Sequence, residues 1–200
     1  GPSAGRWHSV VCIASGPSLT VDDCERVRRW RQEDLAPEEG ARGVIVTNTT
    51  FKAAPWADAL YAMDEAWWRH YLGEVKGTFS GERFSHGVRR DVQRIRAPYF
   101  RQAGQNSGAG AIALAHHFGA RVVYLLGYDC QRTGGKAHWH GDHPEIADPK
   151  RRMGNAGSLP KWPAQFRELV RFVPGLEIIN CSRETALTVF PRASLESVLT

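Results

Sequence analysis

Short apolar runs and helical stretches alternate along most of the chain. The apolar runs are rich in β-branched residues and predict buried parallel strands; they cover residues 9–14, 43–47, 58–63, 121–126 and 176–180. Apolar residues at helical spacing predict helices at 20–31, 64–72, 107–118 and 162–172. The weaker pattern from 73 to 101 allows two further strands, at 75–79 and 92–95. The alternation favours an α/β fold: a doubly wound, mostly parallel, Rossmann-like sheet with helices on both faces.

One long segment does not fit this alternation. Residues 127–160 are polar and rich in Gly, His and Pro. Because a loop of this length in a compact domain is usually functional or disordered, we expect a loop or lid at 131–160. Residues 1–5 are interpreted as the remnant of a tag, which leaves one α/β domain at 6–200.

Composition limits the setting in which the protein works. No apolar run is long enough to span a bilayer, and no secretory signal pattern opens the chain. The four cysteines form no CxxC pair, which is typical of reduced thiols. We therefore expect a cytoplasmic protein without a membrane span.

The net charge of +5 suits an anionic partner such as a nucleotide, a nucleic acid or a membrane surface. The basic residues form two short clusters, 26–31 and 150–152, which ordinary solvated surfaces also contain. No helix-turn-helix, zinc-finger or RNA-binding sheet pattern is present, so nucleic acid is possible but not favoured. The oligomeric state cannot be read from the sequence.

Three polar segments follow three of the predicted strands, at 15–18, 48–50 and 127–130. In a parallel sheet the carboxyl ends of the strands lie along one edge, and ligands bind there at the switch in strand order. The convergence of these segments predicts a ligand site at that edge.

The first segment, Ser15-Gly16-Pro17-Ser18, has the features of a phosphate-binding turn. Gly16 permits close backbone approach, Ser15 and Ser18 add hydroxyl groups, and the following helix offers free N–H groups. We expect bare amide hydrogens at Gly16 and Ser18, aimed at a bound anion. The alternative is an ordinary strand–helix turn with a Ser or Thr cap.

Other candidates come from the later strand ends. Asn48 can bond a base or sugar, or act as a turn residue; Asp64 can hold a hydroxyl group or a metal ion, or cap the helix that follows it. Ser107 and Gly108 open an apolar helix whose N-terminus can face an anion or pack against the sheet. Asp129, just past the clearest strand, is the acid that we favour for a ribose, a base amine or Mg²⁺.

The sequence His138-Trp139-His140-Gly141-Asp142-His143 resembles the two-metal motif of metallo-β-lactamase-type hydrolases. It does not directly follow a buried strand, and the further ligands that such a site needs are missing, so no metal site is predicted. We instead expect a loop histidine, His140 or His143, to act as a general base, with Trp139 stacking on a base or sugar. A surface loop without a special role is the alternative.

Together, Gly16-Pro17-Ser18-Leu19 after the first strand, Asn48, Ser107-Gly108 and Gly127-Tyr128-Asp129 resemble the bacterial sialyltransferases of the Campylobacter type. The pattern is also similar to the wider sialyltransferase-like group, which includes archaeal hydroxymethyl-dihydropterin pyrophosphokinases. The style of the sequence resembles proteins of Mu-like and tailed phages, which implies a phage or prophage member acting in the host cytoplasm.

The resemblance implies which residues contact the nucleotide of a CMP-type donor: Ser15, Gly16, Pro17, Ser18, Asn48, Ser107, Gly108, Gly127, Tyr128 and Asp129. The chain departs from the family pattern at three places. Ser15 stands where the family has Asn, and no His lies near 154–157, where the family base is expected. Tyr128 lies inside the Gly-x-Asp motif, whereas the family's phosphate-contacting Tyr follows it; Cys130 stands at that next position. Nucleotide binding is therefore better supported than sialyl transfer.

Three hypotheses follow from these residues. The first is a glycosyltransferase-like enzyme that uses a nucleotide-activated sugar, with His140, His143 and Asp64 as catalytic candidates. The second is pyrophosphoryl transfer from ATP, with Mg²⁺ on Asp129 and Asp64. The third is a non-catalytic module that binds a nucleotide or a nucleic acid.

Overall fold

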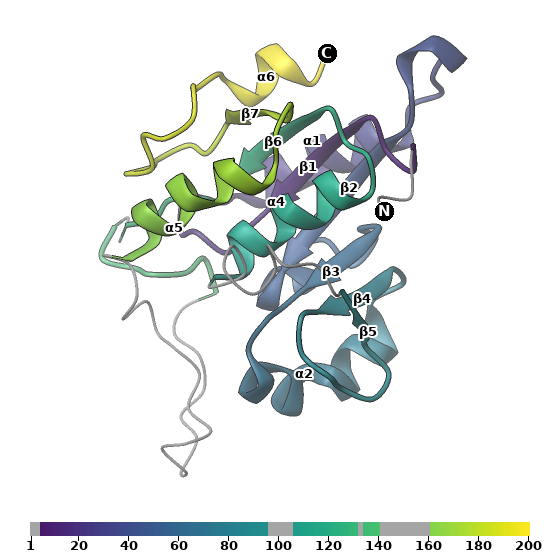
Figure 1. The fold of residues 1–200 in the computed structure, drawn as a ribbon, viewed down its shortest axis with the longest axis vertical. Coiled ribbons are helices and arrows are strands. Elements are labelled where there is room, and N and C mark those ends of the chain that lie inside the picture. The colour runs from purple at the N-terminus through teal and green to yellow at the C-terminus, as the bar shows by residue number, and fades with distance from the viewer. Residues whose placement is uncertain (1–4, 96–105, 132–133, 141–160) are drawn as a thin grey trace.

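A parallel sheet of seven strands forms the centre of the molecule (Figure 1). This structure, a computed structural model, describes residues 5–95, 106–131, 134–140 and 161–200. The strands lie in the order β5-β4-β3-β2-β1-β6-β7, and every neighbouring pair is parallel. Their bounds are β1 Ser9–Ile13, β2 Arg42–Thr47, β3 Ala59–Tyr61, β4 Glu82–Ser85, β5 Gln93–Arg94, β6 Val122–Leu126 and β7 Glu177–Asn180. The predicted doubly wound α/β fold is confirmed.

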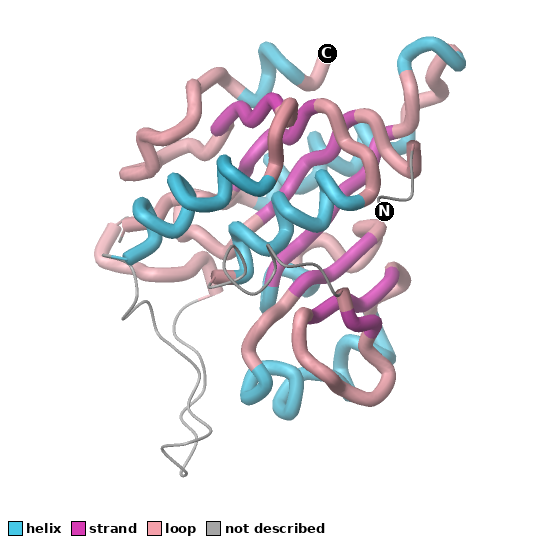
Figure 2. The backbone as a smooth tube through the Cα atoms, in the orientation of Figure 1, coloured by secondary structure: helices cyan, strands magenta, loops and turns pink. Residues whose placement is uncertain are grey.

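Helices cover both faces of this sheet, as the cyan and magenta segments of Figure 2 show. The α-helices are α1 Val21–Gln32, α2 Glu65–Thr78, α4 Ser107–His117, α5 Trp162–Leu169 and α6 Leu195–Val198. Short 3₁₀ turns occupy η1 Pro37–Glu39, η2 Asn48–Lys52 and η5 Val170–Phe172. No helix in the described residues is long and apolar enough to cross a membrane.

The central strand β1 is buried on both of its faces, as its apolar run predicts. Val10 and Cys12 belong to the core cluster that includes α4 and α5, whereas Val11 and Ile13 belong to the cluster that includes α1 and α2. This period of two is the signature of a strand between two helical layers. All four cysteines are free thiols, in agreement with the expectation.

The chain builds the sheet outward from β1 to β5 and then returns to place β6 on the other side of β1. The switch in strand order therefore lies between β1 and β6, so the loops after these two strands lie side by side.

In the segment after residue 73, one predicted strand is wrong and one observed strand was not predicted. The strand expected at 75–79 is wrong, because α2 continues to Thr78; Trp67, Tyr71 and Val75, four residues apart, share its buried face. Strand β4 was not predicted, because its sequence Glu-Arg-Phe-Ser is mostly polar, as is common near the edge of a sheet. The strand expected at 92–95 is present as the shorter β5.

Candidate functional site

A cavity of about 180 Å³ opens at the carboxyl edge of the sheet, between the ends of β1, β2, β3 and β6 and the start of α4. A bound water needs on the order of 10–15 Å³ of such space, so the cavity can admit an organic group. Most of the residues predicted from the sequence line it: Ser15, Gly16, Asn48, Asp64, Ser107, Gly108, Gly127 and Tyr128. The predicted residues Pro17, Ser18, Asp129 and His140 are not among its described lining residues. His143 lies outside the described residues.

The turn after β1 is bonded to the loop after β6. The N–H of Gly16 donates to the carbonyl oxygen of Gly127 at 2.7 Å, and the N–H of Ser18 donates to the Asp129 carboxylate at 2.9 Å. The expectation of bare amide hydrogens at these two positions is therefore wrong. The physical reason is the strand order, since β1 and β6 are neighbours and their loops satisfy each other.

Glycine is required on both sides of this junction. A Cβ atom on Gly16 would lie 2.1 Å from Asp129 Oδ1, and one on Gly127 would lie 2.4 Å from the carbonyl oxygen of Ala14. Gly127 also has a φ of +74°, in the left-handed region that favours glycine. The glycines predicted to approach a phosphate here allow two loops to approach each other.

Asp129 is buried, and both of its carboxylate oxygens accept hydrogen bonds from Ser18. In the cavity's described lining, Asp64 is the only carboxylate. The described residues contain no group of three or more His, Cys, Asp or Glu side chains arranged to hold a metal ion. Asp129 therefore secures the β1 turn in this structure, and its proposed contact with ribose or Mg²⁺ stays a prediction.

Asn48 and Ser107 meet in the cavity wall, although 59 positions separate them in the sequence. The Ser107 hydroxyl donates to Asn48 Oδ1 at 3.1 Å and accepts from the N–H of Met63 at 3.3 Å. Asn48 directly follows β2 and has a φ of +49°, a conformation that is uncommon outside glycine and often marks a functional position. These bonds orient the Asn48 amide at the cavity wall.

The N-terminus of α4 forms another part of the wall. Asn106 caps the helix by accepting from the N–H of Ala109 at 2.8 Å, and its carbonyl oxygen accepts from the N–H of Gly110. The first N–H groups of a helix, here those of Ser107 and Gly108, have no partner within the helix. Since both residues line the cavity, the positive end of the α4 dipole adjoins it.

Tyr128 packs beneath this helix end. Its hydroxyl donates to the carbonyl oxygen of Gly108 at 2.9 Å, and burial raises its pKa well above the usual range. The ring also explains the small residue opposite, because a Cβ on Gly108 would lie 2.9 Å from it. Tyr128 thus fixes the position of the α4 N-terminus.

Asp64 caps a helix and also faces the cavity. Its carboxylate accepts from the N–H of Ala66 at 2.9 Å as the N-cap of α2, and it also lines the cavity. A cap and a ligand contact are compatible, because a carboxylate has two oxygens.

The histidine segment reaches the cavity through His138. This side chain is 92% buried and lines the cavity, and its ring stacks on that of His140 with centroids 5.0 Å apart. The sequence hypothesis named His140 and His143 as bases and did not single out His138, because no pattern distinguishes the three histidines before their segment is placed against β1.

Sequence reasoning did not single out the apolar wall of the cavity. Met63 follows β3, Trp67 lies on α2, and Trp162 and Phe166 lie on α5, yet all four line the cavity. The position of Met63 after a strand end was the available signal. No signal in the sequence brings α5 to this edge.

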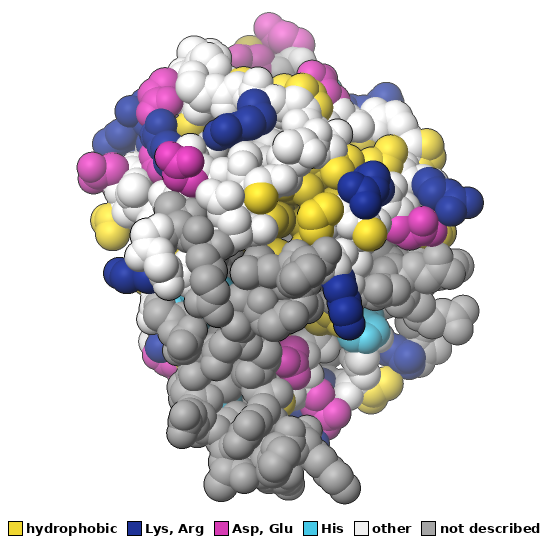
Figure 3. Space-filling model, turned by 90° about the vertical axis from the view of Figure 1, so that its left-hand side faces the viewer, with side chains coloured by type: hydrophobic (Ala, Val, Ile, Leu, Met, Phe, Trp, Pro, Cys, Tyr) yellow, Lys and Arg dark blue, Asp and Glu magenta, His cyan; other side chains and the backbone are white. Residues whose placement is uncertain are grey.

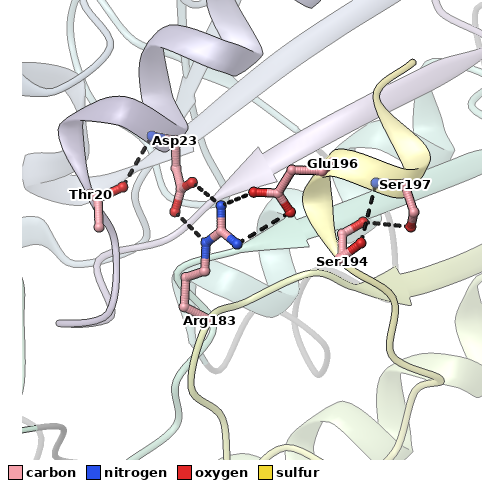
Figure 4. A network of polar contacts seen from close by, with 6 residues as sticks. All are labelled: Thr20, Asp23, Arg183, Ser194, Glu196 and Ser197. Carbon is pink, nitrogen blue, oxygen red and sulfur yellow. Dashed lines mark hydrogen bonds and ion pairs between the residues drawn. The ribbon is translucent and has the colours of Figure 1, made fainter.

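The C-terminal segment is hydrogen-bonded to the loop after β6, which carries part of the site. The Ser182 hydroxyl accepts from the N–H of Tyr128 at 2.8 Å, and the N–H of Ala186 donates to the carbonyl oxygen of Asp129 at 2.8 Å. Arg183 holds this segment in place by donating to both Asp23 of α1 and Glu196 of α6 (Figure 4). This support was not predicted, because the tail has no strong periodicity.

These observations define a class: an α/β protein with a Rossmann-like parallel sheet and a ligand-sized cavity at its carboxyl edge. No known protein family matches the sequence, and no curated protein matches it either. Among solved structures, the chain is similar to the MAf glycosyltransferase from Magnetospirillum magneticum AMB-1, with a TM-score of 0.60 and 17% identity. The match covers 99% of this chain and 36% of that protein. The similarity shows a shared fold and leaves the sialyltransferase and phage assignments as predictions.

Proposed function

We propose that the protein is a nucleotide-dependent transferase that moves a sugar from a nucleotide-activated donor to a hydroxyl group. The observation that carries this proposal is the meeting of Asn48, Ser107, Gly108 and His138 at one cavity on the carboxyl edge of the sheet. They come from separate elements, as expected for a site at the end of a parallel sheet. The glycosyltransferase named among the structural comparisons adds support through its fold.

The proposed binding mode follows from the chemistry of the lining. The N–H groups at the start of α4 face the phosphate, and Asn48 and Asp64 bond hydroxyl or amine groups of the nucleotide. The apolar wall of Met63, Trp162 and Phe166 packs against its rings. In this proposal Ser15, Gly16, Pro17, Ser18, Gly127 and Asp129, which the resemblance assigns to the nucleotide, form the frame around this ligand.

The reaction needs a base and a stabilised leaving group. A loop histidine takes the proton from the acceptor hydroxyl as its oxygen bonds to the sugar carbon. The bond from that carbon to the phosphate oxygen breaks, and the α4 N-terminus stabilises the charge that develops on the phosphate. His138 joins His140 and His143 as a candidate base because it lines the cavity.

A two-stage experiment tests the proposal. Thermal shift with CMP, UDP, GDP and ATP, each with Mg²⁺ and with EDTA, identifies the nucleotide, since a ligand that binds only the folded state raises Tm. Turnover of the corresponding sugar nucleotide is then compared in His138→Ala, His140→Ala and His143→Ala, with the exposed His70→Ala as the matched control.

Loss of the base is expected to lower kcat by about 10²- to 10⁴-fold, with His70→Ala unchanged. Normal kcat in all three loop variants contradicts the mechanism. Activity that disappears in EDTA favours the pyrophosphoryl-transfer alternative. Binding of nucleic acid with a steep salt dependence, without nucleotide binding, favours the non-catalytic module. On the face shown in Figure 3, however, the described Lys and Arg side chains are dispersed and several lie beside Asp or Glu.

A further inference from the structure

Trp139 attaches the histidine segment to the β1 turn at two points. Its backbone N–H donates to the carbonyl oxygen of Ser15 at 3.0 Å, and its indole Nε1–H donates to Thr50 Oγ1 at 3.1 Å. Its neighbour in the chain, His138, lines the cavity. The indole itself packs against the core cluster that includes α1 and α2. The adjacent side chains of His138 and Trp139 therefore differ in position: His138 lines the cavity, and Trp139 attaches the segment to the β1 turn.

The side-chain attachment continues as a chain of hydrogen bonds through Thr50 and Ser15. An indole N–H can only donate, so Thr50 Oγ1 accepts from Trp139. Ser15 Oγ lies 2.9 Å from Thr50 Oγ1 and donates to the carbonyl oxygen of Thr47 at 3.4 Å. Either hydroxyl of the Ser15–Thr50 pair can donate to the other. The chain ends at the last residue of β2.

This chain is buried and connects the histidine segment to two strand ends. Thr50 is fully buried and Ser15 nearly so. A buried hydroxyl that loses its hydrogen-bond partner lowers the stability of the fold, so each member of the chain favours one arrangement of the others. Ser15 also lines the cavity, so the chain joins one wall of the cavity to the segment that supplies His138.

We infer that Trp139 is a positioning residue that sets the place of His138 in the cavity through Thr50 and Ser15. This inference rests on the proposed function only for the role of the histidine as a base. It replaces the expectation that Trp139 stacks on a base or sugar, because the indole N–H is bonded to Thr50 and the ring packs on the core.

The chain offers a matched control for this inference. Thr49, next to Thr50, is also buried and also accepts from an indole, that of Trp67 on α2, at 3.1 Å. Thr49→Val and Thr50→Val therefore remove the same type of bond from neighbouring buried positions. Only Thr50→Val removes the side-chain bond to the histidine segment, whereas Thr50→Ser retains the hydroxyl.

Hydrogen exchange of the 200-residue chain provides the first measurement. Thr50→Val and Trp139→Phe are expected to speed amide exchange in 134–140 by about two- to tenfold relative to Thr49→Val, which is the effect of losing one net hydrogen bond. Thr50→Ser is expected to restore the wild-type rate. The double variant Thr50→Val/Trp139→Phe is expected to exchange no faster than Thr50→Val alone, since both substitutions remove the same bond between Trp139 and Thr50.

The imidazole of His138 provides the second measurement. Its NMR signal, identified by its loss in His138→Ala, is expected to shift in Thr50→Val and Trp139→Phe and to stay in place in Thr49→Val and Thr50→Ser. The inference requires both results, so it is overturned if either the exchange rate or the His138 signal of Thr50→Val matches that of Thr49→Val. A wild-type protein that binds no nucleotide contradicts the proposed function instead, and leaves these two measurements decisive for Trp139.

Discussion

Asp129 accepts two hydrogen bonds from Ser18, one from the backbone N–H at 2.9 Å and one from the hydroxyl at 2.7 Å. The pair joins the loop after β6 to the turn after β1, where the strand order of the sheet reverses. Many Rossmann-like sheets bind a ligand in the crevice at this point. Here the loops bond to each other, and the cavity lies beside them, next to the α4 N-terminus.

Asp129→Asn is expected to weaken this junction. The amide group can replace only one acceptor, and hydrogen bonds to a buried carboxylate are stronger than neutral ones. We expect the free energy of unfolding to fall by about 2–3 kcal/mol in urea denaturation, and Ser18→Ala, which keeps the backbone bond, to lower it by about 1 kcal/mol. Equal stability of wild type and Asp129→Asn would show that the junction contributes little.

Alanine substitution of glycines is expected to have opposite effects at the junction and in α2. In Gly16→Ala the new Cβ meets the Gly127 carbonyl oxygen at 2.3 Å, as well as Asp129, so we expect a loss of about 3 kcal/mol. Gly73 and Gly77 lie within α2, where a Cβ has no atom within 4 Å, so each substitution should stabilise by about 0.5–1 kcal/mol. Thermal and urea unfolding measure both, and destabilisation by Gly73→Ala is the contrary result.

The contact between Arg183 and Glu196 is expected to make stability depend on acid pH. Hydrogen bonds from Arg183 lower the pKa of Glu196 from 4.5 to about 2. A depressed folded-state pKa gives stabilisation that is complete above the unfolded pKa and lost as pH falls through the folded pKa. The stability difference between wild type and Glu196→Gln should therefore be constant above pH 5 and decline between about 4.5 and 2. Urea denaturation across this range tests it, and a difference that does not change with pH contradicts it.

The fold followed from local signals that the sequence carries strongly. The β-branched runs of β1, β2 and β6 and the cap at Thr20, whose hydroxyl accepts from the N–H of Asp23, all appear where the pattern predicts them. Each of these features is decided within a few residues, by burial on both faces of a strand or by one side-chain cap.

The site was predicted less completely, because its bonds connect distant residues. The sequence identifies Gly16 and Asp129 as special positions, but only the adjacency of β1 and β6 shows that they face each other. The role of His138 similarly depends on the docking of Trp139 against Ser15 and Thr50. Partners in a loop–loop contact leave no periodic pattern along the chain, so a single sequence does not reveal them.

Two substitutions at Asn48 are expected to separate backbone strain from ligand binding. Asn48→Gly keeps the positive φ but removes the amide that accepts from Ser107, so we expect a stability loss of only about 1 kcal/mol. Asn48→Ala removes the same amide and also places alanine, which has a Cβ atom but no polar side chain, at φ +49°. This change should lower the free energy of unfolding by about a further 1–2 kcal/mol. If Asn48 contacts the nucleotide, both variants lose the nucleotide-induced rise in Tm equally, although their stabilities differ. A nucleotide shift that survives in Asn48→Gly would remove Asn48 from the proposed site, because that variant preserves the backbone and lacks only the side chain.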